Sequence, residues 1–222
     1  MKTTHKIFFV GTMICAFGLQ TACNSRVDST ADTIIDSSAI KDSCARLQST
    51  AAKEMFFAEQ YFNSGNDYNI PADLQKALNG DGEHQGFLDV IENYDCTKAA
   101  NTAKYYVGTA YLRLGNYDEA IKYLEAYKPE NNTTHSLTLM LLGDAYMEKG
   151  NNQKALDLYV KAAETNPDDV ISPAALFKAG MCCLSTNDKS GALDYFNTIK
   201  EKYPYSAEGN SIDAFIDIAR GI

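Results

Sequence analysis

Small, aromatic and aliphatic residues recur at helical spacing along the middle of the chain, and the whole pattern repeats. The first set is Gly108, Tyr111, Gly115, Ala120 and Leu124. The second set lies 35 residues later and consists of Gly143, Tyr146, Gly150, Ala155 and Tyr159, extended by Ala162 and Pro167. The third follows after a further 37 residues, with Gly180, Ala192, Phe196 and Pro204. Three sets in one register predict three tandem units of two helices each, over residues 101–205.

The residue types of the pattern fit a helical hairpin. A glycine such as Gly108 lets two helices cross closely, and an alanine such as Ala120 does the same from the second helix. Gly115 and Gly150 permit the left-handed residue that ends the first helix, and Asn187, which replaces glycine in the third unit, tolerates the same conformation. The sequence therefore predicts an all-α chain of helical hairpins.

Helical patterns also flank the repeats. Before them, one face of a helix is marked by Leu47, Ala51, Met55, Ala58 and Phe62, a second helix begins at Pro71 and ends at the turn 79–82, and a third carries Phe87, Ile91 and Tyr94. Residues 44–100 are thus predicted to form an N-terminal helical region, a degenerate repeat. Residues 206–222, with Ile212, Phe215, Ile216 and Ala219, are predicted to form a capping helix over the last apolar face.

The first 22 residues have the layout of an export signal. Lys2 and Lys6 precede an apolar run from Ile7 to Leu19, which is too short to span a bilayer comfortably. Cys23 follows, and a cysteine at this place resembles the lipidation site of bacterial lipoproteins, where it becomes the first residue of the mature chain. An ordinary cleaved signal and an uncleaved anchor are the alternatives. Residues 23–43, rich in Ser, Asp and Thr, are predicted to be a flexible tether.

The repeats resemble the tetratricopeptide repeat (TPR), a pattern of about 34 residues with small and aromatic residues at fixed offsets and a late proline. The resemblance covers roughly residues 50–220 and implies a right-handed superhelix of helical hairpins. Residues 74–124 are also similar to bacterial envelope TPR proteins with a membrane-anchoring N-terminus, and through them to the periplasmic TPR subunit that accompanies the Sec translocon. The C-terminal segment FNTIKEKYPYSAEG resembles repeats of outer-membrane-assembly lipoproteins.

The TPR resemblance implies a concave groove lined by the first helix of each hairpin. Carried onto this sequence, the groove positions are Tyr105, Thr109 and Arg113, then Met140, Asp144 and Met147, then Phe177 and Met181. Such an apolar surface with few charges suits an amphipathic or extended peptide. Packing between units is the alternative role of Met140, Phe177 and Met181.

Charge and motif content narrow the function classes. The formal net charge is −9, and loss of residues 1–22 would remove Lys2 and Lys6 and bring it to −11. An acidic surface repels phosphate backbones, so nucleic acid is not an expected partner. No nucleotide-binding, hydrolase or zinc-binding motif occurs in the sequence, and His84 and His135 lie in polar sequence that reads as loop. We therefore expect no catalytic residue, cofactor, metal or small-molecule substrate.

Four cysteines lie beyond Cys23. Export would allow Cys44 and Cys96 to form a disulfide, but a sequence does not give connectivity, so their pairing stays open. Cys182 and Cys183 are adjacent within a helical pattern and are predicted to be small buried hydrophobic residues.

These features together predict a non-catalytic, periplasm-facing TPR lipoprotein of the bacterial cell envelope. Its expected partners are envelope or exported proteins, which it would bind as a scaffold or holdase near a translocation or outer-membrane-assembly site. The lipid on Cys23 would attach it to the membrane. The alternative is a structural adaptor that links subunits of an envelope complex through its convex face and has no groove ligand.

Overall fold

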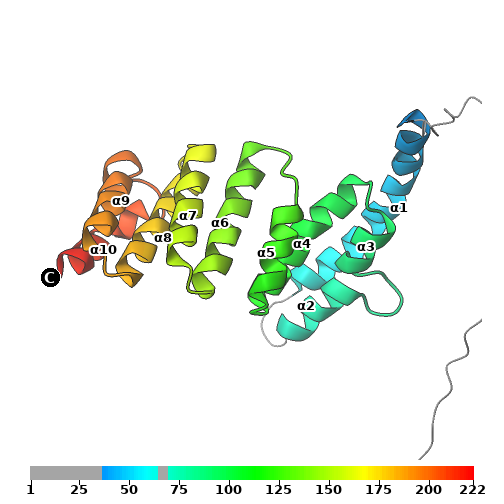
Figure 1. Ribbon diagram of the computed structural model, residues 1–222, viewed down its shortest axis with the longest axis horizontal. Coiled ribbons are helices and arrows are strands. Elements are labelled where there is room, and N and C mark those ends of the chain that lie inside the picture. The colour runs from blue at the N-terminus through cyan, green and yellow to red at the C-terminus, as the bar shows by residue number, and fades with distance from the viewer. Residues whose placement is uncertain (1–36, 65–69) are drawn as a thin grey trace, which may run out of the picture. The chain divides into compact units, whose positions relative to one another are not determined.

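The computed structural model describes residues 37–64 and 70–222, which are helices and connecting turns without strands (Figure 1). The helices are α1 (Ser37–Asn63), α2 (Ile70–Asn79), α3 (Phe87–Asn93), α4 (Lys98–Arg113), α5 (Tyr117–Ala126), α6 (Asn132–Glu148), α7 (Asn152–Thr165), α8 (Ile171–Ser185), α9 (Lys189–Lys202) and α10 (Ile212–Arg220). From α3 onward each helix packs on the next, which confirms the predicted all-α solenoid. The predicted export signal and Cys23 lie outside the described residues. Within them, no helix combines the length and apolar character needed to cross a bilayer.

The predicted close approach of paired helices is confirmed in all three hairpins, α4–α5, α6–α7 and α8–α9. A Cβ added at Gly143 would collide with the ring of Tyr159, and one at Gly180 would collide with the ring of Phe196. Gly108 lies in the same way under the Leu124 side chain. Each glycine therefore makes room for the large residue of the second helix, and this contact fixes how the two helices of a unit cross.

The turns inside the hairpins also have the predicted backbone. Gly115 and Gly150 have φ of 77° and 75°, and Asn187 has φ of 61° in the equivalent place. In the second and third units the next residue caps the second helix: the Asn151 side chain accepts a hydrogen bond from the backbone N–H of Lys154, and Asp188 accepts one from Gly191. These local signals end one helix and begin the next within three residues.

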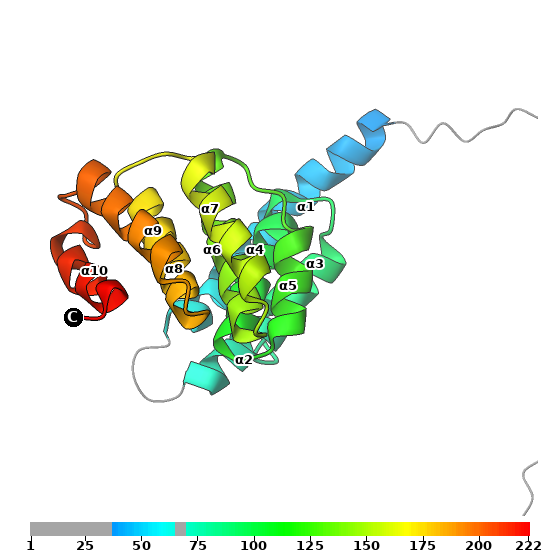
Figure 2. The same ribbon diagram turned by 60° about the vertical axis from the view of Figure 1, so that its left-hand side comes forward.

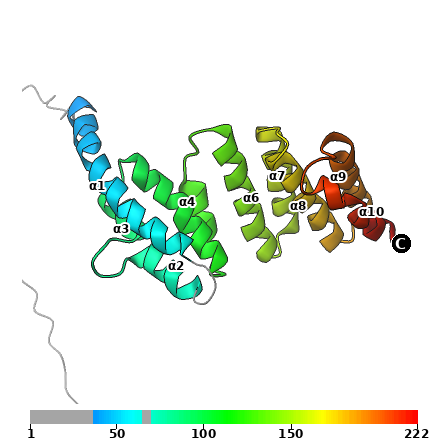
Figure 3. The same ribbon diagram turned by 180° about the vertical axis from the view of Figure 1, so that it is seen from behind.

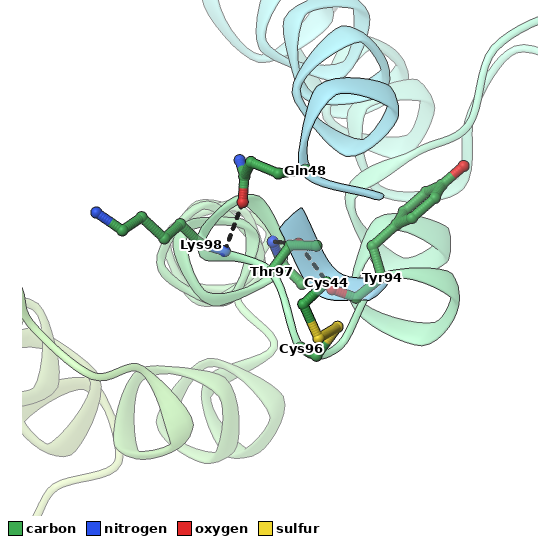
Figure 4. Close-up of a disulfide and its surroundings, with 7 residues drawn as sticks. Cys44, Gln48, Tyr94, Cys96, Thr97 and Lys98 are labelled. Carbon is green, nitrogen blue, oxygen red and sulfur yellow. Dashed lines mark hydrogen bonds between the residues drawn. A yellow bond between two sulfur atoms is a disulfide. The ribbon is translucent and has the colours of Figure 1, made fainter. Parts of the chain in front are cut away.

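The N-terminal region is held together by a disulfide between Cys44 of α1 and Cys96, which precedes α4 (Figure 4). Figure 4 also shows the Gln48 side chain accepting a hydrogen bond of 2.9 Å from the backbone N–H of Lys98, the first residue of α4. Further along α1, Ala51, Met55 and Ala58 are buried against α2, α3 and α4. The pairing left open by the sequence therefore joins α1 to the start of the repeats.

Two details of α1 differ from the sequence-based expectation. The helix begins at Ser37, so residues 37–43 belong to it rather than to the predicted tether. This stretch contains no glycine or proline, and extending a formed helix costs far less than nucleating one. The first turns of α1 extend past the neighbouring helices (Figures 1 and 2). Leu47, expected on the buried face, is 36% exposed.

The C-terminal helix α10 packs on α9 and buries Ile212, Ile216 and Ala219. Phe215 of this helix meets Phe177 of α8 edge to face, with 4.6 Å between ring centroids. The last helix thus covers apolar residues of the third unit, as a capping helix must.

Candidate functional site

The first helices of the three hairpins, α4, α6 and α8, follow one another along one side of the array, and α5, α7 and α9 along the other (Figures 2 and 3). A hollow of about 550 Å³ opens where these first helices end. Its lining consists of Leu112, Tyr117, Asp144, Met147, Glu148, Tyr159, Phe177, Lys178, Met181 and Cys182. Three successive units contribute to it, so its shape depends on how the repeats stack.

A carboxylate held by two donors forms the polar centre of the hollow. The Oδ1 atom of Asp144 accepts a hydrogen bond of 2.8 Å from the hydroxyl of Tyr159 and an ion-pair contact of 2.8 Å from Nζ of Lys178. Burial, and then the neighbouring Asp144 carboxylate, raise the pKa of Tyr159 above its ordinary value. The Tyr159 hydroxyl therefore keeps its proton at neutral pH and donates it to Asp144, and the three residues join α6, α7 and α8 within the hollow.

Apolar side chains surround this polar centre. Met147 and Phe177 are half-buried, and the Met181 side chain is 40% exposed. The position of the Phe177 ring is also fixed, because it packs on the rings of both Phe196 and Phe215. Methionine side chains are unbranched and polarisable and adapt to differently shaped ligands, so this part of the hollow suits an apolar side chain of variable shape.

A second carboxylate, that of Glu148, lies at the edge of the hollow. It is exposed, and its Oε2 accepts a hydrogen bond of 3.2 Å from the hydroxyl of Tyr117. The neighbouring Lys149 forms an ion pair with Asp118 of α5 instead. The lining thus carries two acidic groups and one basic group.

The eight residues assigned to the groove from the sequence fall into two groups. Asp144, Met147, Phe177 and Met181 all line the one hollow. The other four, Tyr105, Thr109, Arg113 and Met140, do not line it.

These four residues have structural contacts. Tyr105 and Met140 are half-buried against the apolar cluster that contains Leu124 and Leu139, and the Thr109 hydroxyl donates to the backbone carbonyl of Tyr105 at 2.8 Å. The Arg113 guanidinium lies over the ring of Phe62 of α1, 5.2 Å from its centroid. Packing is thus what the structure shows for Met140, whereas Phe177 both packs and lines the hollow.

Sequence reasoning missed Tyr159 as a site residue. The repeat pattern predicts that this residue fills the space between successive units, and its ring packs with Ala179 and Cys182 of the next unit as well as over Gly143 of its own. Its hydroxyl reaches through to Asp144, which no periodicity signals, although the choice of tyrosine over the equivalent Leu124 and Phe196 is a hint that a polar atom is needed there.

The remaining candidates for chemistry are distributed differently. The His84 ring stacks on Phe57 at 3.5 Å between centroids. His135 lies in the first turns of α6 rather than in a loop, because the N-cap Asn131 starts that helix earlier than its polar sequence suggests. Cys182 and Cys183 are buried, as predicted. Over residues 37–64 and 70–222 no group of three His, Cys, Asp or Glu side chains is placed to hold a metal ion.

Comparison with known proteins agrees with the fold. A family model described as tetratricopeptide repeat matches residues 87–133 and 140–207, which together make up more than half of the chain. A comparison with curated proteins found no match.

Proposed function

Because the chain belongs to the tetratricopeptide repeat family, whose helical scaffolds bind protein partners, we propose that it is an envelope lipoprotein that captures a peptide segment of an envelope or exported protein. The hollow between α4, α6 and α8 is the proposed binding site. The protein acts as a scaffold or holdase and carries out no reaction itself. The lipid on Cys23 holds it at the membrane, facing the periplasm.

One observation carries the binding half of this proposal: apolar side chains and a fixed polar centre converge in a single hollow. Its volume of about 550 Å³ lies within the range of roughly 300–1,000 Å³ that is usual for ligand sites. Met147 and Met181 offer adaptable apolar contact, while Asp144 offers an oriented acceptor. A peptide bound through one apolar side chain and one polar contact fits this combination.

The disulfide supports the export half of the proposal. Disulfides persist in oxidising compartments such as the periplasm and are rare in the cytosol. Cys44 and Cys96 are placed to form one, and they lie beyond a segment with the layout of an export signal. The cysteine at position 23 follows that segment directly.

Photo-crosslinking in living cells tests the binding site. A photoreactive amino acid placed at Met181 is expected to give adducts with one or a few defined envelope proteins. The matched control is Lys161, an exposed residue of α7 that does not line the hollow. Adducts from Lys161 and none from Met181 would contradict the groove proposal and favour the adaptor that works through its convex face.

Metabolic labelling with an alkyne-tagged fatty acid tests the anchor. The wild-type chain is expected to become labelled and to sediment with membranes, and Cys23→Ala is expected to abolish the label. A labelled Cys23→Ala chain, or an unlabelled wild-type chain recovered from the cytoplasm, would refute the lipoprotein assignment.

A further inference from the structure

We propose that the hollow selects a basic amphipathic segment, in which an aliphatic side chain enters beside Met147 and Met181 while a lysine or arginine of the same segment pairs with Glu148. This inference rests on the proposed function, because it names the chemistry of the peptide that the hollow takes. It is carried by the charges of the lining and by their partners.

The basic group of the lining is already neutralised from within. Lys178 lies 2.8 Å from Oδ1 of Asp144, so its charge is matched by that carboxylate. The Tyr159 hydroxyl donates to the same oxygen and holds Asp144 in place. A peptide carboxylate that approached Lys178 would have to compete with a fixed, partly buried ion pair, so an acidic segment is disfavoured here.

The second acidic group has no such partner. In the described part of the chain, Glu148 forms no ion pair; its Oε2 accepts only the neutral hydroxyl of Tyr117. Lys149, the nearest cation in sequence, pairs with Asp118. The charge of Glu148 is therefore uncompensated and exposed at the edge of the hollow, where a cationic side chain of a ligand can reach it.

Asp144 adds a second acceptor inside the hollow. Both of its donors bind Oδ1, and Oδ2 receives no hydrogen bond from the rest of the described structure. That oxygen is free to accept an N–H from a bound segment. The formal net charge of the whole chain, −9, also favours a basic ligand, because it attracts basic partners over longer distances.

The apolar half of the hollow sets the other requirement. Met181 is 40% exposed beside Phe177, and a solvent-facing methionine of this kind gains contact when an aliphatic side chain covers it. An apolar residue and a basic residue that act together must lie on one face of the ligand, three or four positions apart if the segment is helical.

Methionine-methyl NMR of the full-length chain, embedded in zwitterionic nanodiscs, tests this proposal. The methyl groups carry ¹³C, and single Met→Leu variants assign Met55, Met147 and Met181. The probes are a peptide of Leu, Ala and Lys about four helical turns long, and its twin in which every Lys is Glu. We expect the Lys peptide to shift the Met147 and Met181 signals and to leave that of Met55, buried in the N-terminal cluster, unchanged.

A matched pair of variants isolates the charge. Glu148→Gln is expected to weaken binding of the Lys peptide by about 2- to 5-fold, the usual effect of one exposed ion pair, and added salt should reduce the difference. Glu164→Gln removes an exposed acid at the end of α7, away from the hollow, and should leave the affinity unchanged.

The outcomes separate this inference from the proposed function. Equal shifts of Met181 by the Lys and Glu peptides would overturn the basic preference and leave peptide capture intact. Shifts confined to Met55, or an affinity that is unaffected by Glu148→Gln, would also overturn it. If neither peptide shifts any signal, the inference fails, and crosslinking from Met181 in cells decides the proposed function independently.

Discussion

Breaking the Cys44–Cys96 disulfide is expected to loosen the N-terminal end of the fold. The two cysteines are 52 residues apart in sequence. Closing a loop of that length removes chain entropy from the unfolded state worth about 4 kcal/mol at 25 °C. This is an upper value for the loss of unfolding free energy, because structure that remains in the unfolded, reduced chain lowers the entropy that the disulfide can remove.

The loss should be local. Between residues 41 and 50 of α1, all residues are exposed except Cys44 and Gln48, which are half-buried, so this part of the helix contributes no residue to the buried core. Without the disulfide, the hydrogen bond from the Lys98 N–H to Gln48 still connects this part of α1 to α4. An unsupported helical segment of this length is marginal in water, and we expect its amides to exchange freely.

Hydrogen exchange measured by mass spectrometry, on the oxidised chain, the reduced chain and a Cys44→Ala/Cys96→Ala variant, tests this reasoning. Exchange is expected to increase in α1 and to stay unchanged in α8 and α9, because each repeat contacts only its neighbours. Thiol titration of the unfolded chain provides the control: reduction should release two additional thiols. Equal protection of α1 in all three samples, or an equal loss in α9, would refute the argument.

Three further predictions concern single sites. Gly143→Ala gains about 1 kcal/mol of helix propensity, but its Cβ collides with the buried Tyr159 ring at a cost of about 1–3 kcal/mol, so denaturant unfolding should show a net loss of stability of up to about 2 kcal/mol. Hydrogen bonds, above all the one from the backbone N–H of His84, lower the pKa of Asp81 to about 2, below its ordinary value of 3.8. The stabilisation of the folded state that results is complete above the ordinary pKa and should be lost as the pH falls from about 4 to 2. A pH series of thermal unfolding should show this loss in the wild-type chain and not in Asp81→Asn. Burial raises the pKa of the Cys183 thiol to about 11, so iodoacetamide at pH 8 should modify it in the native chain far more slowly than in urea.

The repeat positions could be predicted from the sequence because each depends on contacts that recur with the repeat. Gly143 must be small because it meets the second helix of its own hairpin, and Gly150 must tolerate a positive φ because it ends the first helix. Asn187 takes the place of glycine in the third unit and also has a positive φ, so this turn could be predicted as well. Each of these steric requirements restricts the residue type at one position, and the same restriction recurs in every unit.

Other features depend on contacts between residues far apart in the sequence. The pairing of Cys44 with Cys96 requires α1 to lie across the start of α4, and no local pattern encodes that placement. The start of α1 at Ser37 could not be predicted from composition. A polar composition indicates that a segment is not buried, but a helix can extend into solvent once the rest of it is packed. The position of Tyr159 in the repeat explains its ring, which lies over Gly143, but not its hydroxyl, which bonds to Asp144.

Tyr159 contributes both to the packing of the repeats and to the candidate binding site. Gly143 lacks a side chain, so the Tyr159 ring can lie against α6, and its hydroxyl donates to Asp144, the next residue of that helix. Asp144 in turn places Lys178 of the next unit, so the polar centre of the hollow also ties the second repeat to the third. A peptide that binds there contacts groups whose positions are set by repeat stacking. The stability of the α6–α8 junction and the affinity of the hollow are therefore coupled, and binding should stabilise that junction more than either end of the array.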